Sequence, residues 1–298
     1  MNREQWLLER RKCIGASDAA AILGQSPWRS PYAVWAEKCH GITTTEETER
    51  MRWGLALEQP IADEFTHWAE ENLDAFTHLT DPGLEIAYMP GYPYIGATLD
   101  RLVWDAEECM GPLEIKTADS FRSKDWDYAV PLPYQIQLQH QMMVTGHKIG
   151  WVAVLIGGNR FRVFEQSRND KFIDRLLSRL MEFWRLVETQ TPPDADGSQS
   201  TKAAIQALHP LDNGVEIELP DNEWSEDIEY LQELKEKIKE LEVDVAVIEN
   251  RIRSVMGDAT YAHVGDWTFS NKNQTRKAYT VPEKSFRVLR CGKRKDND

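Results

Sequence analysis

The 298-residue sequence has no run of eighteen apolar residues, and its first residues carry no hydrophobic stretch of the signal-peptide kind. We therefore expect a cytoplasmic protein with no membrane association. Its four cysteines lie far apart, and no two of them form a C-x-x-C pair. This spacing argues against a zinc ribbon, an iron–sulfur cluster and a disulfide framework, and it favours reduced, structural thiols.

An excess of positive charge is also missing. The formal net charge is −14, whereas a DNA-binding protein is expected to present a basic surface. Charge is local, however, and basic residues gather at 10–12 and in 271–298, where nine Lys and Arg stand against three Asp and Glu. The acidic excess lies elsewhere, notably in 221–249. The net charge thus argues against a nucleic-acid partner without excluding one.

Composition predicts a folded domain with an appendage, since 41% of the residues are hydrophobic and 10% are aromatic. A segment rich in Pro, Asp, Gly and Ser begins at residue 191 and is typical of a linker. We expect a domain over 1–190, a linker over 191–207 and a C-terminal extension over 208–298. The extension should end in a small basic β-element at 259–269 and 278–289.

Within the extension, apolar residues recur every three or four positions, which predicts a helix with a heptad seam. The seam consists of Leu231, Leu234, Ile238, Leu241, Val245, Ile248, Ile252 and Val255. We expect it to pair with another helix, in this chain or in a partner, and so to support oligomerisation or docking.

The centre of the sequence predicts a hairpin of two strands, 94–104 and 113–117. Glu114 and Lys116 alternate with apolar residues and should share one face of the second strand, while Asp100 lies inside the first. Burying an unpaired charge costs several kcal/mol, so ordinary strands avoid such a set. Two carboxylates beside an ammonium suit a divalent-metal hydrolase. A solvated sheet face with an ordinary Glu–Lys pair is an equal alternative on spacing alone.

Two predicted helices add polar candidates. Glu58 interrupts the apolar stripe of a helix over 51–69, in which Leu55 is expected to be buried. It is either a further metal carboxylate or an ordinary, partly exposed glutamate. A helix over 131–145 carries a row of glutamines, of which Gln135 and Gln139 share a face. They either orient water and phosphate or simply solubilise a surface.

The N-terminal segment predicts two helices with a break, and Ser17 and Asp18 are typical capping residues for the second. Arg10 lies seven residues upstream of Ser17. A serine hydroxyl and arginines beside a helix start suit a phosphate site. On this segment alone, a capped surface helix with solvated arginines is the favoured alternative.

Five segments occur together in a distinctive order: R-R-K-C-I-G-A-S-D at 10–18, W-G-L-A-L-E at 53–58, G-A-T-L-D at 96–100, L-E-I-K-T at 113–117 and Q-I-Q-L-Q-H-Q-M at 135–142. In order and spacing they resemble the YqaJ-type viral recombinase family, relatives of the phage lambda exonuclease within the PD-(D/E)XK nuclease superfamily. The resemblance covers roughly residues 1–190. Leu99 replaces the proline of the formal signature, and the segment from 208 onward lies outside the lambda-like core.

The resemblance implies an α/β fold with a restriction-endonuclease-like core, a central mixed β-sheet flanked by helices. It also implies hydrolysis of DNA phosphodiesters with Mg²⁺, for which Mn²⁺ is a possible substitute. By matching motif positions, Glu58, Asp100 and Glu114 would bind the metal, helped by the carbonyl of Ile115.

The same matching gives roles to four further residues. Lys116 would position or activate the attacking water, and Gln139 would lie near this water and the scissile phosphate. Arg10 and Ser17 match positions that hold a 5′-phosphate in the lambda-type enzyme.

The function implied is a 5′→3′ exonuclease on double-stranded DNA ends, which makes single strands for an annealing protein or a recombinase. The lambda-type enzyme is a ring-shaped trimer, so the resemblance also implies a homo-oligomer. Two alternatives remain open: an endonuclease or nickase on the same core, and a non-catalytic DNA- or protein-binding module.

Overall fold

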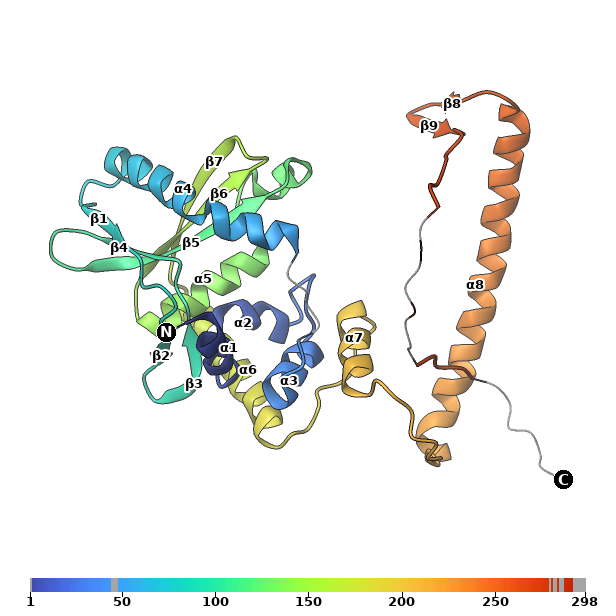
Figure 1. Ribbon diagram of the computed structural model, residues 1–298, viewed down its shortest axis with the longest axis horizontal. Helices are drawn as coiled ribbons and strands as arrows, with labels where there is room; N and C mark the ends of the chain where they lie inside the picture. Colours follow the sequence, from blue (N-terminus) through green and yellow to red (C-terminus); the bar gives the residue numbers. More distant parts are fainter. Residues whose placement is uncertain (1, 44–47, 279, 281–282, 284–286, 292–298) are drawn as a thin grey trace. The chain divides into compact units, whose positions relative to one another are not determined.

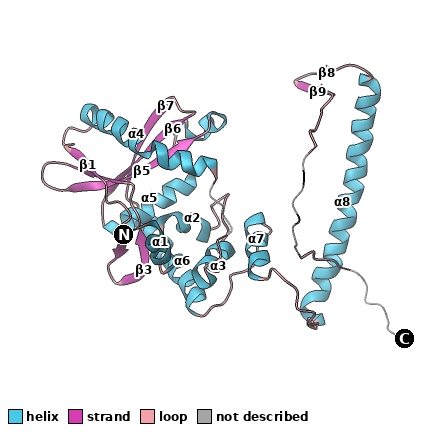
Figure 2. Cartoon of the chain, in the orientation of Figure 1, coloured by secondary structure: helices cyan, strands magenta, loops and turns pink. Residues whose placement is uncertain are grey.

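The computed structural model describes residues 2–43, 48–278, 280, 283 and 287–291. The chain divides into two units, Met1–Pro210 and Leu211–Asp298. In the part of the chain that the structure describes, no helix is long and apolar enough to cross a membrane. Figure 2 shows that the first unit mixes helices and strands.

A five-stranded mixed sheet forms the centre of the first unit. Its strand order is β1 (His78–Thr80), β4 (Arg101–Trp104), β5 (Cys109–Ala118), β6 (Ile149–Ile156) and β7 (Arg160–Ser167). The β5 and β6 strands run parallel, and the other neighbours are antiparallel. Gly157 and Gly158 turn β6 into β7 with positive φ angles, in agreement with the hairpin signature G-G-N.

Helices cover both faces of this sheet (Figure 1), which confirms the predicted fold class. On one face lies α4 (Glu49–Asn72), and on the other lies α5 (Leu132–Thr145). The α4 side buries Ile61, Phe65, Leu113, Ile115 and Trp151. The α5 side buries Leu138, Met142, Val152, Val154 and Ile156. Leu55, in contrast, is exposed, so the buried stripe of α4 begins later than predicted.

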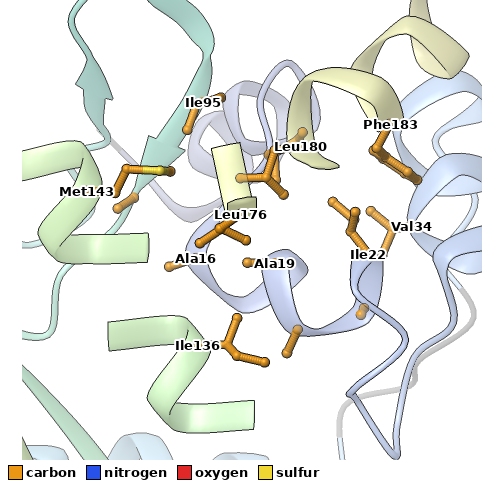
Figure 3. Packing of buried hydrophobic residues seen from close by; sticks show 14 of the residues in the cluster. Ala16, Ala19, Ile22, Val34, Ile95, Ile136, Met143, Leu176, Leu180 and Phe183 are labelled. Carbon is orange, nitrogen blue, oxygen red and sulfur yellow. The ribbon is translucent and has the colours of Figure 1, made fainter. Parts of the chain in front are cut away.

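Behind α5 lies a third layer of helices: α1 (Arg3–Arg11), α2 (Ala16–Ile22), α3 (Pro31–His40) and α6 (Asp170–Glu188). Figure 3 shows its core, in which the small side chains of α2 lie between α5 and α6. The labelled contacts come from Ala16, Ala19, Ile22, Ile136, Met143, Leu176 and Leu180. Because alanines dominate the inner face of α2, its backbone approaches its neighbours closely.

The strand predicted over 94–104 is in fact two strands. The first, β3 (Tyr92–Ala97), pairs with β2 (Ala87–Met89) in a separate two-stranded sheet, whereas β4 belongs to the central sheet. The chain bends between them at residues 98–100, where the carboxylate Oδ2 of Asp100 accepts a hydrogen bond of 2.8 Å from the backbone N–H of Ile115. The hairpin of β4 and β5 forms as predicted.

The segment predicted as a linker, 191–207, contains most of a helix. This helix, α7 (Gln199–Leu208), is capped by Ser198 and packs against α3, with Thr201 and Ala204 buried. The apolar side of α7 therefore belongs to the first unit, and the division into units falls after Pro210.

The second unit consists of one long helix, α8 (Asp221–Met256), followed by a hairpin of β8 (Tyr261–Val264) and β9 (Trp267–Ser270). The hairpin coincides with the β-element expected at 259–269, except that β9 ends one residue later, at Ser270. Of the element expected at 278–289, six residues lie outside the described part of the chain, and the described ones form no strand.

Candidate active site

One cavity of about 460 Å³ brings together residues that are far apart in the sequence. Six of the predicted site residues line it: Arg10, Ser17, Glu58, Asp100, Glu114 and Lys116. They come from α1, α2, α4, the bend before β4, and β5. Gln137 of α5 also lines the cavity, but the predicted Gln139 does not.

Glu114 is the most buried of the predicted site residues, and Lys116 lies beside it. The period of two along β5 directs both toward α5, whereas Leu113 and Ile115 face α4, as predicted. The Glu114 side chain is only 1% exposed and forms an ion pair with the ammonium of Lys116. A buried carboxylate needs such partners, because burial without them is costly.

Two glutamines of α5 complete the surroundings of Glu114. Gln137 donates a hydrogen bond of 2.6 Å to Oε1, and Gln141 donates one of 2.5 Å to Oε2. Both carboxylate oxygens are thus fixed in orientation. The side chains of Gln137 and Gln141 project to the same side because they are one helical turn apart.

The surroundings of Asp100 disfavour the ionised form of its carboxyl group. Burial and the negative charge of Glu114 raise its pKa to about 8, although Lys116 and the N–H of Ile115 act in the opposite direction. For Lys116, burial alone would lower the pKa, but the charges of Glu114 and Asp100 outweigh it and raise the pKa above its ordinary value. Lys116 is therefore protonated, with its ammonium also 5.2 Å from the ring centre of Tyr134.

Glu58 lines the cavity but is bound to a cation from the chain itself. Its Oε1 accepts a hydrogen bond of 2.6 Å from Nη1 of Arg101, which is 5% exposed. Nη2 of Arg101 donates to Gln59 at 3.0 Å, and Nη1 lies 3.5 Å from a carboxylate oxygen of Asp81. No local sequence pattern indicates a role for Arg101, because its partner Glu58 lies 43 positions away.

The structure places Gln139 away from the cavity. Its amide donates to the carbonyl of Ser167 at 2.9 Å and accepts from the N–H of Asn169 at 2.8 Å, so it fixes the start of α6. The expectation that Gln139 lies beside the attacking water is thus not met. The row of glutamines contains two pairs with helical spacing, and the pair 137/141 is the one that faces β5.

Arg10 and Ser17 contact each other on the part of the cavity wall that α1 and α2 form. A guanidinium nitrogen of Arg10 donates to the hydroxyl of Ser17, and the same guanidinium lies 5.1 Å from the ring centre of Trp6. Ser17 is exposed and does not cap α2, because Gly15 occupies the N-cap position. Asp18 instead accepts a hydrogen bond of 3.1 Å from the N–H of Gly15.

Asp18, the residue after Ser17, is fully buried and forms two ion pairs. Its carboxylate contacts Arg29 at 2.8 Å and Lys38 at 2.8 Å. Although burial alone would raise its pKa, these two cations lower the pKa well below its usual range. Lys38 also donates to the carbonyl of Arg10 at 2.9 Å, which ties the end of α1 to α3.

A metal site in this cavity would rest on two carboxylates. Among the described residues, no three carboxylate, imidazole or thiolate side chains cluster closely enough to hold an ion. The donor set still fits Mg²⁺, which keeps several waters and is commonly bound through one or two carboxylates together with substrate phosphates. Burial and the charge of Glu114 disfavour the ionised form of Asp100, and a bound cation would favour it.

Comparisons with known proteins agree with the resemblance in the sequence. The model of the YqaJ-like viral recombinase domain matches residues 5–148. The uncharacterized protein YqaJ of Bacillus subtilis (strain 168) is 32% identical over 290 residues, which cover 93% of this chain and 87% of that protein.

Solved structures show the same fold. An alkaline exonuclease from Laribacter hongkongensis superposes with a TM-score of 0.51 at 21% identity, over 63% of this chain and 93% of that one. Its complex with dAMP gives the same values. With a third of its residues identical to those of YqaJ over nearly its whole length, the chain belongs to the YqaJ-like viral recombinase family.

Proposed function

We propose that this protein is a Mg²⁺-dependent deoxyribonuclease that degrades double-stranded DNA from its ends in the 5′→3′ direction. The observation that carries the proposal is the cavity in which Asp100 and Glu114 lie beside the ammonium of Lys116. The names of the solved relatives, an alkaline exonuclease and its complex with dAMP, support a nuclease acting on DNA.

Asp100 and Glu114 would hold the cation, which when bound stabilises negative charge on phosphate oxygens and lowers the pKa of a bound water. Mn²⁺ is expected to substitute for Mg²⁺. Glu114 is held in one orientation by Gln137 and Gln141, so its oxygens are directed before any ligand arrives. Lys116 is protonated and can only donate hydrogen bonds, so it would orient the attacking water by donating to a lone pair of the water oxygen.

The remaining predicted ligands have separate roles in this proposal. Glu58 would join the metal site only when it leaves Arg101, since its Oε1 is bound to that guanidinium. The predicted contribution of the Ile115 carbonyl stays a prediction, because the contact seen is from the Ile115 N–H to Asp100.

Arg10 and Ser17 would bind the 5′-phosphate of a DNA end. A guanidinium and a hydroxyl that already share a hydrogen bond present several donors in one place, and both line the cavity that contains the carboxylates. A clamp on a terminal phosphate would make cleavage dependent on DNA ends. The single strands produced would serve an annealing protein or a recombinase.

The experiment is digestion of a 5′-phosphorylated linear duplex and of a covalently closed circle in the presence of Mg²⁺. We expect only the linear DNA to be degraded, and Arg10→Gln to remove the preference for a 5′-phosphate over a 5′-hydroxyl. Cleavage of the circle would instead establish an endonuclease.

Lys116→Met and Asp100→Asn test the site itself and should abolish degradation. Lys171→Met is the matched control, because Lys171 is an exposed lysine on α6. Full activity in the Lys116 and Asp100 variants would refute the assignment. Binding without cleavage by the unmodified protein would favour a non-catalytic module.

A further inference from the structure

The hairpin of β8 and β9 presents part of one face to solvent. It turns at Gly265, where φ is positive, and its pairing sets Val264 opposite Trp267. The next pair on the same face is Ala262 with Phe269. These two are half-buried, whereas Trp267 is 73% exposed and Val264 is 63% exposed. The end of this face beside the turn is therefore open.

Trp267 is the most exposed of the eleven tryptophans in the chain. Tryptophan is large and on average highly buried, so a ring in this position contributes little to a core. In the part of the chain that the structure describes, the Trp267 ring stacks on no other aromatic ring. A single exposed apolar side chain is ordinary, however, and it is the neighbouring charges that give this one a meaning.

Positive charge follows the hairpin directly. Lys272, Arg276 and Lys277 lie in residues 271–278, which contain no Asp or Glu. All three are exposed, and none forms an ion pair with a described residue. The ammonium of Lys272 lies 4.7 Å from the ring centre of Tyr261 on β8, which places the first of these cations against the hairpin. Between residues 259 and 278 the sequence has one acid, Asp266 in the turn.

This basic segment follows a strongly acidic helix. α8 holds eleven Asp and Glu against five Lys and Arg, and the whole chain has a formal net charge of −14. A chain with this net charge needs no basic segment for solubility. The local reversal of sign beside exposed rings therefore fits a ligand that is both anionic and aromatic.

We propose that the β8–β9 hairpin and residues 271–278 bind single-stranded DNA. Trp267 stacks on an unpaired base, and Lys272, Arg276 and Lys277 contact the phosphates. Exposed rings beside a row of cations are the means by which proteins hold single strands without reading their sequence. A duplex covers the faces of its bases, so this arrangement selects an unpaired strand.

The choice of DNA over RNA rests on the proposed function, in which the first unit produces single strands of DNA. The site itself does not rest on it. Binding is therefore measured on the full-length protein in EDTA, where metal-dependent hydrolysis cannot occur. A loss of binding in the variants below concerns this site alone, and an absence of cleavage with Mg²⁺ concerns the nuclease alone.

The first experiment measures the affinity for a fluorescein-labelled oligothymidylate by fluorescence anisotropy. Trp267→Ala should weaken binding roughly five- to 150-fold, the range for the loss of one stacked base. Trp267→Phe retains a ring and should bind more tightly than Trp267→Ala. Trp224→Ala is the matched control, because Trp224 is a 43% exposed tryptophan on the acidic α8, and it should bind as the unmodified protein does.

The second experiment tests the cations, which lie beyond the hairpin and can be replaced without disturbing it. Lys272→Gln, Arg276→Gln and Lys277→Gln together should lower the slope of log K against log salt by about 2, since each phosphate contact on a single strand contributes about 0.7. The control replaces three lysines of α8, Lys235, Lys237 and Lys239, by glutamine and should leave the slope unchanged.

The third experiment locates the contact. An oligonucleotide that carries 5-iododeoxyuridine should cross-link under ultraviolet light to a peptide that contains Trp267. Cross-links confined to the first unit, or unchanged affinity in both Trp267→Ala and the triple variant, would overturn the proposal. An equal loss of duplex binding in Trp267→Ala would overturn the selection of single strands, and tighter binding of oligouridylate would overturn the choice of DNA.

Discussion

Binding of a divalent cation to the cavity should depend steeply on pH, because Asp100 must lose a proton to become a ligand. Its pKa is raised to about 8 by burial and by the charge of Glu114. Below that pH, each unit should weaken binding by about tenfold, since one pKa unit corresponds to about 1.4 kcal/mol. Asp100 is already half protonated at pH 8, so between pH 8 and pH 6 we expect a loss of roughly fiftyfold, or about 2.3 kcal/mol.

The same shift fixes the pH dependence of stability in the absence of metal. The folded protein keeps the Asp100 proton up to about pH 8, whereas the unfolded chain releases it near the ordinary aspartate pKa of 3.8. The folded state thus binds more protons in this window, and its stability should fall as pH rises from about 4 to about 8, by up to about 1.4 kcal/mol per unit. Above pH 8 this contribution becomes constant.

The assay is isothermal titration calorimetry with Ca²⁺ and without DNA, at several pH values between 6 and 9. Asp100→Asn should bind weakly and without this pH dependence, while Asp174→Asn, an isosteric change on the exposed side of α6, should behave as the unmodified protein. An affinity that stays constant across this range would refute the reasoning, since no proton would then compete with the cation.

Three further predictions concern fixed polar side chains. Gln137→Leu should reduce kcat with little change in Tm, whereas Gln139→Leu should lower stability by ~1–3 kcal/mol through two lost hydrogen bonds and leave kcat nearly unchanged. Steady-state kinetics and thermal unfolding separate the two, and the reverse pattern would restore the role first predicted for Gln139. Arg101→Gln should cost roughly 2 kcal/mol in urea unfolding by leaving Glu58 without its cation, and an unchanged midpoint would contradict the importance of that pair. Asp18→Asn should cost more, about 3–5 kcal/mol, because the buried ammonium of Lys38 loses its carboxylate and Arg29 keeps only Glu37; a smaller loss than for Arg101→Gln would contradict the burial seen here.

The sequence predicts well what depends on local periodicity. The alternation along 113–117 correctly separates Glu114 and Lys116 from the apolar side of β5, since side chains on a strand must alternate. The helical spacing of α4 and α6 likewise predicts which elements cover a sheet or a core.

What the sequence does not reveal is set by contacts between distant segments. The choice between the two glutamine pairs of α5 depends on which side of the helix meets β5, and both pairs have the same spacing. The ion pair of Arg101 with Glu58 joins β4 to α4, and no local pattern indicates it. The bend at 98–100 is likewise fixed by a hydrogen bond from β5, so the continuous run of strand-forming residues conceals it.

A comparison of the two buried acidic groups explains why one is structural and the other suits catalysis. Asp18 is a single carboxylate between two cations, Arg29 and Lys38, and its pKa falls well below the usual range. Asp100 and Glu114 are two carboxylates that share one ammonium, and the pKa of Asp100 rises instead. Arg29 also pairs with Glu37 at 2.6 Å, so the charges of the first group cancel, whereas in the second group one ammonium faces two carboxyl groups and Asp100 keeps its proton up to about pH 8. A divalent cation that displaces this proton would give the second group a net positive charge, and the resulting positive site would attract a phosphate.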